Sequence, residues 1–460
     1  MSIFNSDLKL EEITSLLKKI NCSVHFVGVL GSGMYPLARL LLGRGYSVSG
    51  SDDNATADRY TDPYGILVQR SGHLPSCDMV VYSLAIDEAN PEILSAYARG
   101  IPLISRAQLL GALMREYRTR ISVSGSHGKS TTTALIDHIF ARSGTPHTTV
   151  SGATLSDGEV YTDGGGEIFL AEACEYKNSF LRLCPSHQII TSIELDHTDF
   201  FHDTEMLLES FYKAAIGADV ILVNADDPLA HDIALRVKKE GKRVCTYGKC
   251  DGADYRFAAL EQGGDTTAFS VVSAHRTFTL STSLIGEFNL YNITAAVAMA
   301  DMIGIAPADI ERGVASFKTI DRRLTIISEI GGTPIYYDYA HHPTEIEAVA
   351  RALKERYGSL TVIFRPHTYS RTKSLWCDFI DVFSKVDFTI LVDIYPAREK
   401  SIDGINSKAL ADEIPGGIYC PMQDAARTAL LCRSGAVALM GAGEVDVIKR
   451  ELIELGRKKG

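Results

Sequence analysis

One stretch decides the fold: Gly125-Ser126-His127-Gly128-Lys129-Ser130-Thr131-Thr132-Thr133. It follows the apolar, β-branched run 121–124 and leads into an apolar helical pattern that starts at Ala134. A strand, a glycine turn and a helix N-terminus form an anion site, because backbone N–H groups and the helix dipole face the same phosphate. Lys129 can reach the outer phosphates, and the Ser130 hydroxyl can bind Mg²⁺. The sequence therefore predicts an ATP-binding loop.

This loop departs from the strict G-x-x-x-x-G-K-[ST] pattern. Val123 stands at the first glycine position, and a shorter G-x-x-G-K-S loop remains. The alternative is a glycine turn with a neighbouring lysine that binds nothing. The strand before the turn and the helix after it favour the nucleotide loop.

Length and composition narrow the class of protein. A chain of 460 residues is too long for one ordinary core and suggests about three domains. Its 45% hydrophobic and 22% charged residues are typical of a globular protein, and its net charge of -11 argues against broad binding to nucleic acid or anionic membranes. The nine cysteines include no C-x-x-C pair, and neither a secretory signal nor an apolar run of ~18 residues is present. We expect reduced thiols and a cytoplasmic location.

Strand and helix patterns alternate along the chain, which predicts an α/β fold with largely parallel sheets. Three units are expected, with boundaries at 1–117, 118–318 and 319–460. The expected strands are 24–28, 47–50, 79–82, 189–193, 220–224, 335–339, 360–364, 388–392 and 436–440. The expected helices include 36–42, 107–117, 293–302 and 344–357, and the stretch 257–284 is β-rich.

A second glycine turn, Gly28-Val29-Leu30-Gly31-Ser32-Gly33, lies between the first strand and the first helix. In that position it can cradle a pyrophosphate at the helix N-terminus. Asp52 follows the second strand, where an acid that contacts a ribose or a base is expected. The spacing is G-x-x-G-x-G, and a turn that only tightens a βαβ unit is the alternative. If both glycine turns bind, each of the first two domains holds one nucleotide-like ligand.

Polar residues follow strands of the second unit. Glu172 follows the strand-like run 167–171, and Glu194, Asp196 and His197 come after the strand 189–193. Carboxylates at strand ends beside a phosphate loop suit Mg²⁺, which prefers oxygen ligands. The alternative is that the acids cap backbone groups and that His197 is a hydrogen-bonded core residue.

Two polar clusters follow strands of the third unit, at 338–346 and 364–372. Side by side in a sheet, they would form a positive rim for a carboxylate or phosphate. Solvated loop charge is the alternative. Asn292, at the start of an alanine-rich helix, can cap that helix or contact a purine, and the residues alone favour the cap.

Together these segments resemble, in order and over nearly the full length, the Mur ligase family. Residues 125–133 are similar to its G-T-H-G-K-T-T-T-T loop, and 193–197 to its metal-site segment ending in D-H. Residues 286–292 resemble its adenine-contact segment, and 321–323 its interdomain arginine pair. The segments 338–346 and 364–372 resemble D-Y-[AG]-H-H-P-T-E-[IV] and F-Q-P-H-x-Y-[ST]-R-T.

The resemblance implies three domains: an N-terminal Rossmann-like domain for the UDP part, a central P-loop ATPase and a C-terminal Rossmann-like ligase domain. It implies ATP and Mg²⁺ as cofactors, and UDP-N-acetylmuramate and L-alanine as substrates in peptidoglycan precursor synthesis. The lactyl carboxylate would attack the γ-phosphate, and the amine would then displace phosphate from the acyl phosphate. Hinge motion and a monomer or homodimer are also expected.

The resemblance also assigns roles, residue by residue. Catalytic roles fall to Lys129, Glu172, His197, His341 and Arg371. Metal binding is expected at Ser130, Glu172 and His197. ATP contacts are expected at Gly125, Ser126, His127, Gly128, Lys129, Ser130, Thr131, Asn292, Arg323 and Asp338. UDP-sugar and amino-acid contacts are expected at Gly28, Gly31, Ser32, Gly33, Asp52, Ser83, His342, His367 and Arg371.

The sequence departs from the family pattern at several positions in these motifs. Ser126 and Ser130 replace threonines, which keeps the hydroxyl groups. Cys174 replaces an aspartate, Phe288 a histidine and Leu324 a phenylalanine. The Arg-Arg-Leu form resembles the murein peptide ligase, which joins a tripeptide to the same UDP-sugar. The segment after Tyr176 has no basic insertion, which favours alanine. A nucleotide-binding regulator without catalysis is a third alternative, and intact Lys129 argues against it.

Overall fold

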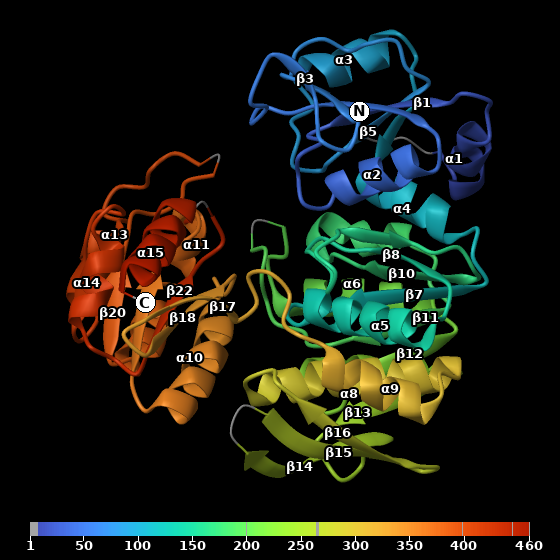
Figure 1. Ribbon diagram of the computed structural model, residues 1–460. Coiled ribbons are helices and arrows are strands. Elements are labelled where there is room, and N and C mark those ends of the chain that lie inside the picture. The colour runs from blue at the N-terminus through green and yellow to red at the C-terminus, as the bar shows by residue number, and fades with distance from the viewer. Residues whose placement is uncertain (1–7, 199, 264–265, 398, 444, 460) are drawn as a thin grey trace. The chain divides into compact units, whose positions relative to one another are not determined.

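The computed structural model describes residues 8–198, 200–263, 266–397, 399–443 and 445–459. The chain divides into two compact units, Met1–Ser283 with Tyr291–Phe317, and Leu284–Leu290 with Lys318–Gly460. In the described ranges the strands form three sheets of six, ten and six strands (Figure 1). Most strand pairs are parallel, so the predicted α/β class with three mostly parallel sheets is confirmed.

The N-terminal sheet has the strand order β3-β4-β2-β1-β5-β6. Its strands are β1 (Ser23–Val27), β2 (Ser47–Ser51), β3 (Arg59–Thr61), β4 (Leu67–Gln69), β5 (Met79–Tyr82) and β6 (Leu103–Ser105). Its helices are α1 (Leu10–Leu17), α2 (Tyr35–Gly43), α3 (Pro91–Ala98) and α4 (Arg106–Met114). Strand β1 pairs in parallel with β2 on one side and β5 on the other. The glycine turn after β1 therefore lies where the strand order reverses, the usual ligand crevice of an open parallel sheet.

The central sheet has the order β16-β15-β14-β13-β12-β11-β7-β10-β8-β9. Its strands up to β13 are β7 (Thr119–Ser124), β8 (His147–Val150), β9 (Tyr161–Asp163), β10 (Ile168–Glu172), β11 (His187–Ile190), β12 (Val220–Asn224) and β13 (Arg243–Gly248). Its connecting helices are α5 (Lys129–Ser143), η1 (Tyr176–Arg182), α6 (Thr204–Ile216) and α7 (Pro228–Lys239). Strand β7 pairs in parallel with β10 and β11, so the phosphate loop after β7 also lies at a point where the strand order reverses.

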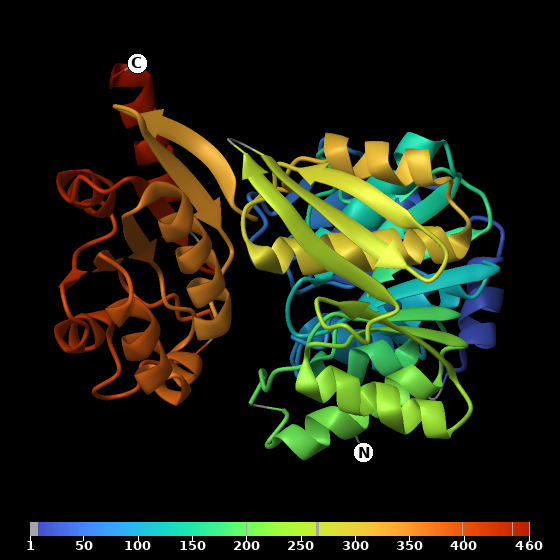
Figure 2. The same ribbon diagram turned by 90° about the horizontal axis from the view of Figure 1, so that it is seen from below.

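The β-rich stretch closes this sheet with antiparallel strands: β14 (Tyr255–Gly263), β15 (Thr266–Ser273) and β16 (Thr277–Thr282) (Figure 2). Helices α8 (Glu287–Ile303) and α9 (Pro307–Ser316) follow, and α9 packs on α5 and β16. Exposed and buried residues alternate along β16, because one face of the strand packs on the core and the other faces solvent; this accounts for the β-rich pattern of residues 257–284.

The C-terminal sheet has the order β17-β18-β22-β19-β20-β21. Its strands are β17 (Thr325–Ile330), β18 (Thr333–Asp338), β19 (Leu360–Phe364), β20 (Phe388–Leu391), β21 (Gly417–Tyr419) and β22 (Ala436–Met440). Its helices are α10 (Pro343–Tyr357), α11 (Tyr369–Ser374), α12 (Trp376–Ser384), α13 (Ser407–Glu413), α14 (Ala425–Leu431) and α15 (Asp446–Lys459). Strands β18, β22 and β19 run parallel, so the polar clusters after β18 and β19 end at the same edge.

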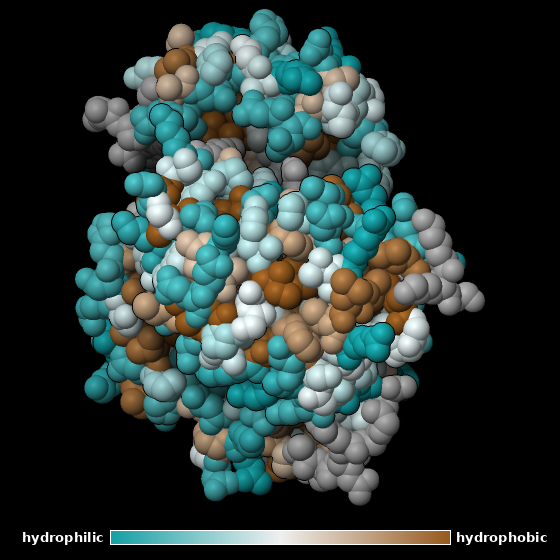
Figure 3. Space-filling model, turned by 90° about the vertical axis from the view of Figure 1, so that its left-hand side faces the viewer, coloured by the Kyte–Doolittle hydropathy of each residue, from teal (hydrophilic) through white to brown (hydrophobic). Residues whose placement is uncertain are grey.

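Cysteines, helices and exposed apolar residues bear on the expectations from composition. All nine cysteines lie in the described ranges and are free thiols. No helix in those ranges is both long and apolar enough to cross a membrane. On the face drawn in Figure 3, hydrophobic areas lie among hydrophilic ones. Exposed large apolar residues of the C-terminal unit are Ile326, Phe388, Ile418, Leu431 and Val447.

Candidate active site

The phosphate loop requires glycine at two positions. Gly125 has φ +133° and Gly128 has φ +83°, in the region that side chains rarely adopt. A Cβ at Gly125 would collide with the Thr191 hydroxyl, and one at Gly128 with the side-chain oxygen of Asn292. Gly128 is also the residue before helix α5, so the loop delivers its N–H groups to the helix N-terminus.

The chain after β11 holds this loop in place. Ser126 N donates to Ser192 O at 2.8 Å, and Glu194 N donates to Ser126 Oγ at 2.8 Å. The Thr191 hydroxyl donates to the His127 carbonyl. The strand expected over 189–193 ends at Ile190. Thr191 N still donates to the Ser124 carbonyl at the end of β7, but Ser192 and Glu194 bond the loop.

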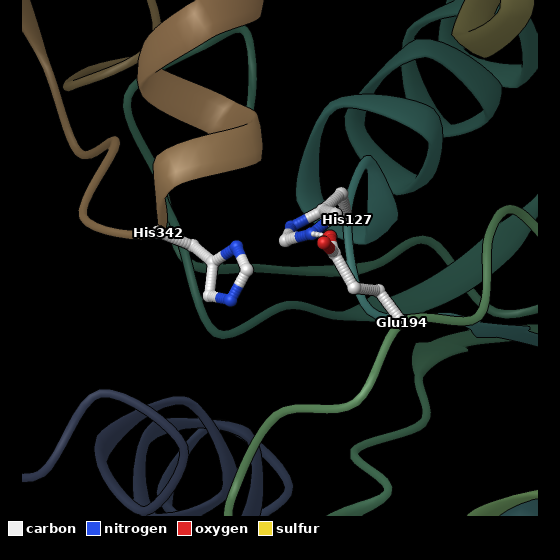
Figure 4. A group of neighbouring side chains, drawn as sticks. All are labelled: His127, Glu194 and His342. Carbon is white, nitrogen blue, oxygen red and sulfur yellow. Dashed lines mark hydrogen bonds and ion pairs between the residues drawn. The ribbon is translucent and has the colours of Figure 1, made fainter. Parts of the chain in front are cut away.

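His127 and Glu194 face each other across the loop. The His127 Nε2 and Glu194 Oε2 atoms are 2.6 Å apart, the contact dashed in Figure 4. Glu194 thus contacts the loop histidine through its side chain and Ser126 through its backbone. His342, also labelled there, belongs to the C-terminal unit, where it precedes α10.

Lys129 lies at the centre of a charged cluster. Its Nζ donates to the Gly125 carbonyl, to Ser126 O at 3.2 Å and to both oxygens of Glu175 at 3.1 and 3.2 Å. Burial opposes the charge on Lys129, but the attraction and hydrogen bonds of Glu175, together with Glu172 and Cys174, outweigh it, so the pKa of Lys129 is raised. The loop therefore carries a fixed positive charge beside the helix N-terminus.

Ser130 and Glu172 meet directly, as the predicted metal pair requires. Ser130 Oγ donates to Glu172 Oε2 at 3.2 Å, and Ser151 Oγ donates to Glu172 Oε1 at 2.6 Å. The hydroxyl and carboxylate oxygens are the donors that Mg²⁺ prefers. Two residues on, burial raises the pKa of the Cys174 thiol, and nearby Glu175 raises it further, so this thiol stays neutral at pH 7.

His197 lies on the other side of Glu175. Its Nε2 is 3.8 Å from Glu175 Oε1, and its ring lies beside the Tyr176 ring with centroids 4.8 Å apart. His197 has φ 55°, a left-handed conformation, and its N–H donates to Asp196 Oδ1 at 2.6 Å. Glu175 thus connects Lys129 and the candidate metal histidine.

The N-terminal glycine turn and Asp52 also come together. Leu30 N donates to Asp52 Oδ2 at 3.0 Å, and Gly28 N donates to Ser51 O at 2.8 Å. A Cβ on Gly33 would lie 3.1 Å from Cδ of Arg106, the first residue of α4, so this glycine allows a close approach. Gly31 and Ser32 complete the turn.

Ser83 directly follows β5 on the same side of this sheet. Its hydroxyl accepts from Ala85 N at 3.3 Å, and its carbonyl accepts from Ile86 N at 3.0 Å. Ile86 Cδ1 would lie 3.4 Å from a Cβ on Gly28, so the loop that Ser83 opens reaches the glycine turn.

In the first compact unit, Asn292 lies against the loop that precedes α5. The Thr132 hydroxyl donates to Asn292 Oδ1 at 3.4 Å. Thr131 and Ser130 are buried in the first turn of α5. Helix α8 begins at Glu287, so Asn292 lies inside the helix and does not cap it, and the cap that the residues alone favoured is wrong. The Asn292 amide instead lies beside residues of the loop.

In the C-terminal unit Asp338 is buried at the end of β18. It accepts from Leu324 N and Ala340 N, both at 2.7 Å. Burial raises the pKa of Asp338 to about 6, although Arg323 lowers it. Leu324 is buried in this core and has φ 48°, and Phe288 packs against the same core.

Asp338 should make the stability of the C-terminal unit depend on pH. The pKa of Asp338 in the folded protein lies above the unfolded value of 3.8. The contribution of Asp338 to the unfolding free energy is therefore fully present below pH 3.8 and is lost as pH rises through about 6. We expect the difference in unfolding free energy between wild type and Asp338→Asn to fall by up to about 3 kcal/mol between pH 4 and 7. Urea unfolding of both proteins across this range measures it. A difference that is constant with pH would contradict the expectation.

The two polar clusters of this unit meet at one edge, as predicted. The rings of His341 and His367 have centroids 6.1 Å apart. His341 N donates to Glu345 Oε2 at 3.1 Å, and His342 is buried at the start of α10. Arg371 lies in α11, which follows β19.

Sequence reasoning missed Glu175, Ser151 and Arg106. Glu175 lies 46 positions from Lys129, and Ser151 lies 21 from Glu172, so only the folded sheet brings these pairs together. The repeated carboxylate in the run Glu172-Ala173-Cys174-Glu175 was a usable signal for Glu175. The first unit can thus present the Lys129 cation to a phosphate, and a hydroxyl and carboxylates to a divalent metal ion.

Family models match all three parts of the chain. They are the Mur ligase family catalytic domain over residues 23–118, the Mur ligase middle domain over 123–300, and the Mur ligase glutamate ligase domain over 322–443. A UDP-N-acetylmuramate--L-alanine ligase of Syntrophus aciditrophicus is 37% identical over 423 residues, which are 89% of this chain and 86% of the relative. The ligase of the same name from Thermobifida fusca is 36% identical over 458 residues, 94% of this chain and 96% of the relative.

Solved structures have the same fold. The UDP-N-acetylmuramate-alanine ligase of Thermotoga maritima matches with a TM-score of 0.79 at 21% identity, over 95% of this chain and 100% of that one. A murein peptide ligase of Psychrobacter arcticus matches with a TM-score of 0.68 at 19% identity, over 94% and 98%. With its phosphate loop, its strand-end acids and these matches, the chain belongs to the Mur ligase family.

Proposed function

We propose that the protein is an ATP-dependent ligase that joins L-alanine to the lactyl carboxylate of UDP-N-acetylmuramate, in peptidoglycan precursor synthesis. The observation that carries the proposal is the phosphate loop, in which Lys129 is held beside Ser130 and Ser130 bonds Glu172. Relatives named for this reaction match most of the chain, at 36–37% identity for the two described above.

The reaction transfers a phosphoryl group and then an acyl group. A carboxylate oxygen attacks the γ-phosphorus of ATP, the bond to the bridging oxygen breaks, and ADP leaves. The amine of L-alanine then attacks the acyl carbon, and phosphate leaves as the amide forms. Such a transfer depends on positioning and charge neutralisation, which Lys129 and the N–H groups of the loop supply.

Mg²⁺ is part of the proposal, because the donor set fits it. Ser130 and Glu172 present a hydroxyl and a carboxylate 3.2 Å apart, and we assign His197 to a second ion. When bound, Mg²⁺ neutralises charge on the β- and γ-phosphates. Glu175 keeps Lys129 oriented toward the loop, with the pair 18% and 5% exposed.

The remaining assignments follow the three sheets. We assign the UDP part to the glycine turn 28–33 with Asp52 and Ser83, in a domain of residues 1–117. Residues 118–318 would bind ATP, with Asn292 contacting the nucleotide. Arg323 and Asp338, which belong to the C-terminal unit, are also assigned to the nucleotide. Residues 319–460 would present His341, His342, His367 and Arg371 to the muramoyl and amino-acid groups. Free thiols throughout favour a cytoplasmic location, and we propose a monomer or homodimer.

Phosphate release with each substrate omitted in turn tests the proposal. We expect release only when ATP, UDP-N-acetylmuramate and L-alanine are all present. Turnover with the tripeptide L-alanyl-γ-D-glutamyl-meso-diaminopimelate in place of L-alanine would instead identify a murein peptide ligase. Binding of ATP with no turnover under any combination would indicate a regulator.

Arg371 should act on the amino-acid side of the reaction. Its guanidinium can bind a carboxylate through two parallel hydrogen bonds, which a lysine cannot reproduce. We expect Arg371→Lys to raise the KM for L-alanine or lower kcat about tenfold, ~1.4 kcal/mol, with the KM for ATP near wild type. Kinetics with each substrate varied in turn measures this. An effect confined to the KM for ATP, or no effect, would remove Arg371 from the site.

A further inference from the structure

The loop that follows β19, residues 365–371, has a strained backbone. Thr368 lies within it at φ 61° and ψ 148°, outside the regions that a β-branched residue ordinarily adopts. Such a conformation is energetically unfavourable and persists only where neighbouring groups hold it. The same loop carries His367 and Arg371, so the groups that hold it also set the directions of these side chains.

Tyr395, which follows β20, holds the first half of this loop. Thr368 N donates to Tyr395 O at 2.8 Å, and Tyr395 N donates to Pro366 O at 2.8 Å. These two bonds form an isolated parallel bridge between His367 and Tyr395. The rings of these two residues also stack, with centroids 5.6 Å apart and planes 25° apart. Backbone and ring together fix His367 on one side of Thr368.

Glu399 holds the second half of the loop. Ser370 N donates to Glu399 Oε2 at 2.8 Å, and the Ser370 hydroxyl donates to Glu399 Oε1. Helix α11 begins at Tyr369, and the first N–H groups of a helix have no partner within it. The Glu399 carboxylate at this end accepts a hydrogen bond from one of these N–H groups, and the helix dipole stabilises its negative charge. Burial opposes the charge, but the Ser370 bonds outweigh it and lower the pKa of Glu399, so it is ionised at pH 7.

Arg371 follows Ser370 in the same helical turn, so the Glu399 contact fixes the start of the helix that carries the guanidinium. We propose that Tyr395 and Glu399 are positioning residues that set His367 and Arg371 for recognition of the amino-acid substrate, an inference that rests on the proposed function. Tyr395 acts through the loop backbone and through its stack on the His367 ring. Glu399 acts through Ser370 at the start of α11. Neither residue needs to touch the substrate.

A double-mutant cycle tests the proposal. Glu399→Gln keeps the size of the side chain but removes its charge, and we expect it to raise the KM for L-alanine about tenfold. The KM values for ATP and UDP-N-acetylmuramate should change less than about twofold. In an Arg371→Ala background the same substitution should change the KM for L-alanine less than about twofold, since its effect passes through Arg371. Equal effects in both backgrounds would overturn the proposal.

Thr368→Gly separates positioning from general stability. Glycine adopts this φ without strain, so the variant should melt at or above the wild-type temperature. Because the freed loop no longer fixes Arg371, its KM for L-alanine should nevertheless rise. An unchanged KM in a folded Thr368→Gly protein would overturn the proposal. Glu451→Gln is the matched control, since this carboxylate accepts from Arg427 in the same unit at 3.1 Å and should leave all three KM values unchanged.

Failure of the proposed function and failure of the positioning role give different results. If wild type shows no turnover dependent on L-alanine, the proposed function fails. If Arg371→Ala raises the KM for L-alanine but Glu399→Gln does not, only the positioning role fails.

Discussion

Lys129→Ala should abolish ligation and leave binding of UDP-N-acetylmuramate largely intact. Lys129 lies in the loop after β7 of the ten-stranded sheet, whereas the glycine turn assigned to the UDP part follows β1 of another sheet. Removing the cation that neutralises the transferred phosphoryl group should lower kcat by at least about a thousandfold, ~4 kcal/mol. Phosphate-release kinetics measures the first effect and calorimetry with UDP-N-acetylmuramate the second. A comparable loss of UDP-sugar affinity would contradict the division of the two sites.

A control for stability is needed, because Lys129 neutralises a buried carboxylate. Removing Lys129 takes away the nearest cation of buried Glu175 and leaves His197, 3.8 Å away, so it should cost about 3 kcal/mol of unfolding free energy. The double variant Lys129→Ala with Glu175→Gln removes both charges and should recover much of that stability. Its activity should stay as low as that of Lys129→Ala. Recovery of activity together with stability would show that Lys129 only maintains the fold.

Glu172→Gln should impair the enzyme far more than Cys174→Asp. Glu172 accepts from both Ser130 and Ser151, so its carboxylate is aimed at the loop hydroxyl. Losing its charge should raise the Mg²⁺ concentration needed for half-maximal rate and lower kcat about a hundredfold, ~2.7 kcal/mol. Cys174→Asp restores the commoner family residue and should stay within about tenfold of wild type.

Magnesium titrations of the initial rate with both variants measure these effects. Ser151→Ala is an informative companion, because it removes one donor to Glu172 and keeps the carboxylate. We expect the kcat and the Mg²⁺ requirement of Ser151→Ala to lie between those of Glu172→Gln and Cys174→Asp. Equal, mild effects at positions 172 and 174 would remove Glu172 from the metal assignment.

The core strands were predicted well because local pattern alone determines them. The strands Met79–Tyr82, Val220–Asn224 and Leu360–Phe364 have the predicted bounds, and each is a short apolar run between turn residues. Parallel strands that are buried on both faces appear in the sequence as continuous apolar runs, whichever strands they pair with. The two glycine turns were found for the same reason, since a positive φ demands glycine within the loop itself.

What the sequence did not predict depends on long-range contacts. The strand expected to reach Ile193 ends at Ile190, because Thr191, Ser192 and Glu194 bond residues of the phosphate loop that lie 64 to 68 positions earlier. Strands β8 and β9 were not predicted. Strand β9 is polar, and its Asp163 pairs with Arg44 of the N-terminal domain at 2.8 Å. The Glu175 and Glu399 contacts likewise arise only when distant strand ends come together.

Isotope transfer tests the central claim most directly. UDP-N-acetylmuramate carrying two ¹⁸O atoms in its lactyl carboxylate would be incubated with the protein, ATP, Mg²⁺ and L-alanine, and the products analysed by mass spectrometry. If the carboxylate attacks the γ-phosphate and the amine then displaces phosphate, one ¹⁸O must appear in phosphate and one must remain in the new amide. An amide product with unlabelled phosphate, or no amide product at all, would contradict the account.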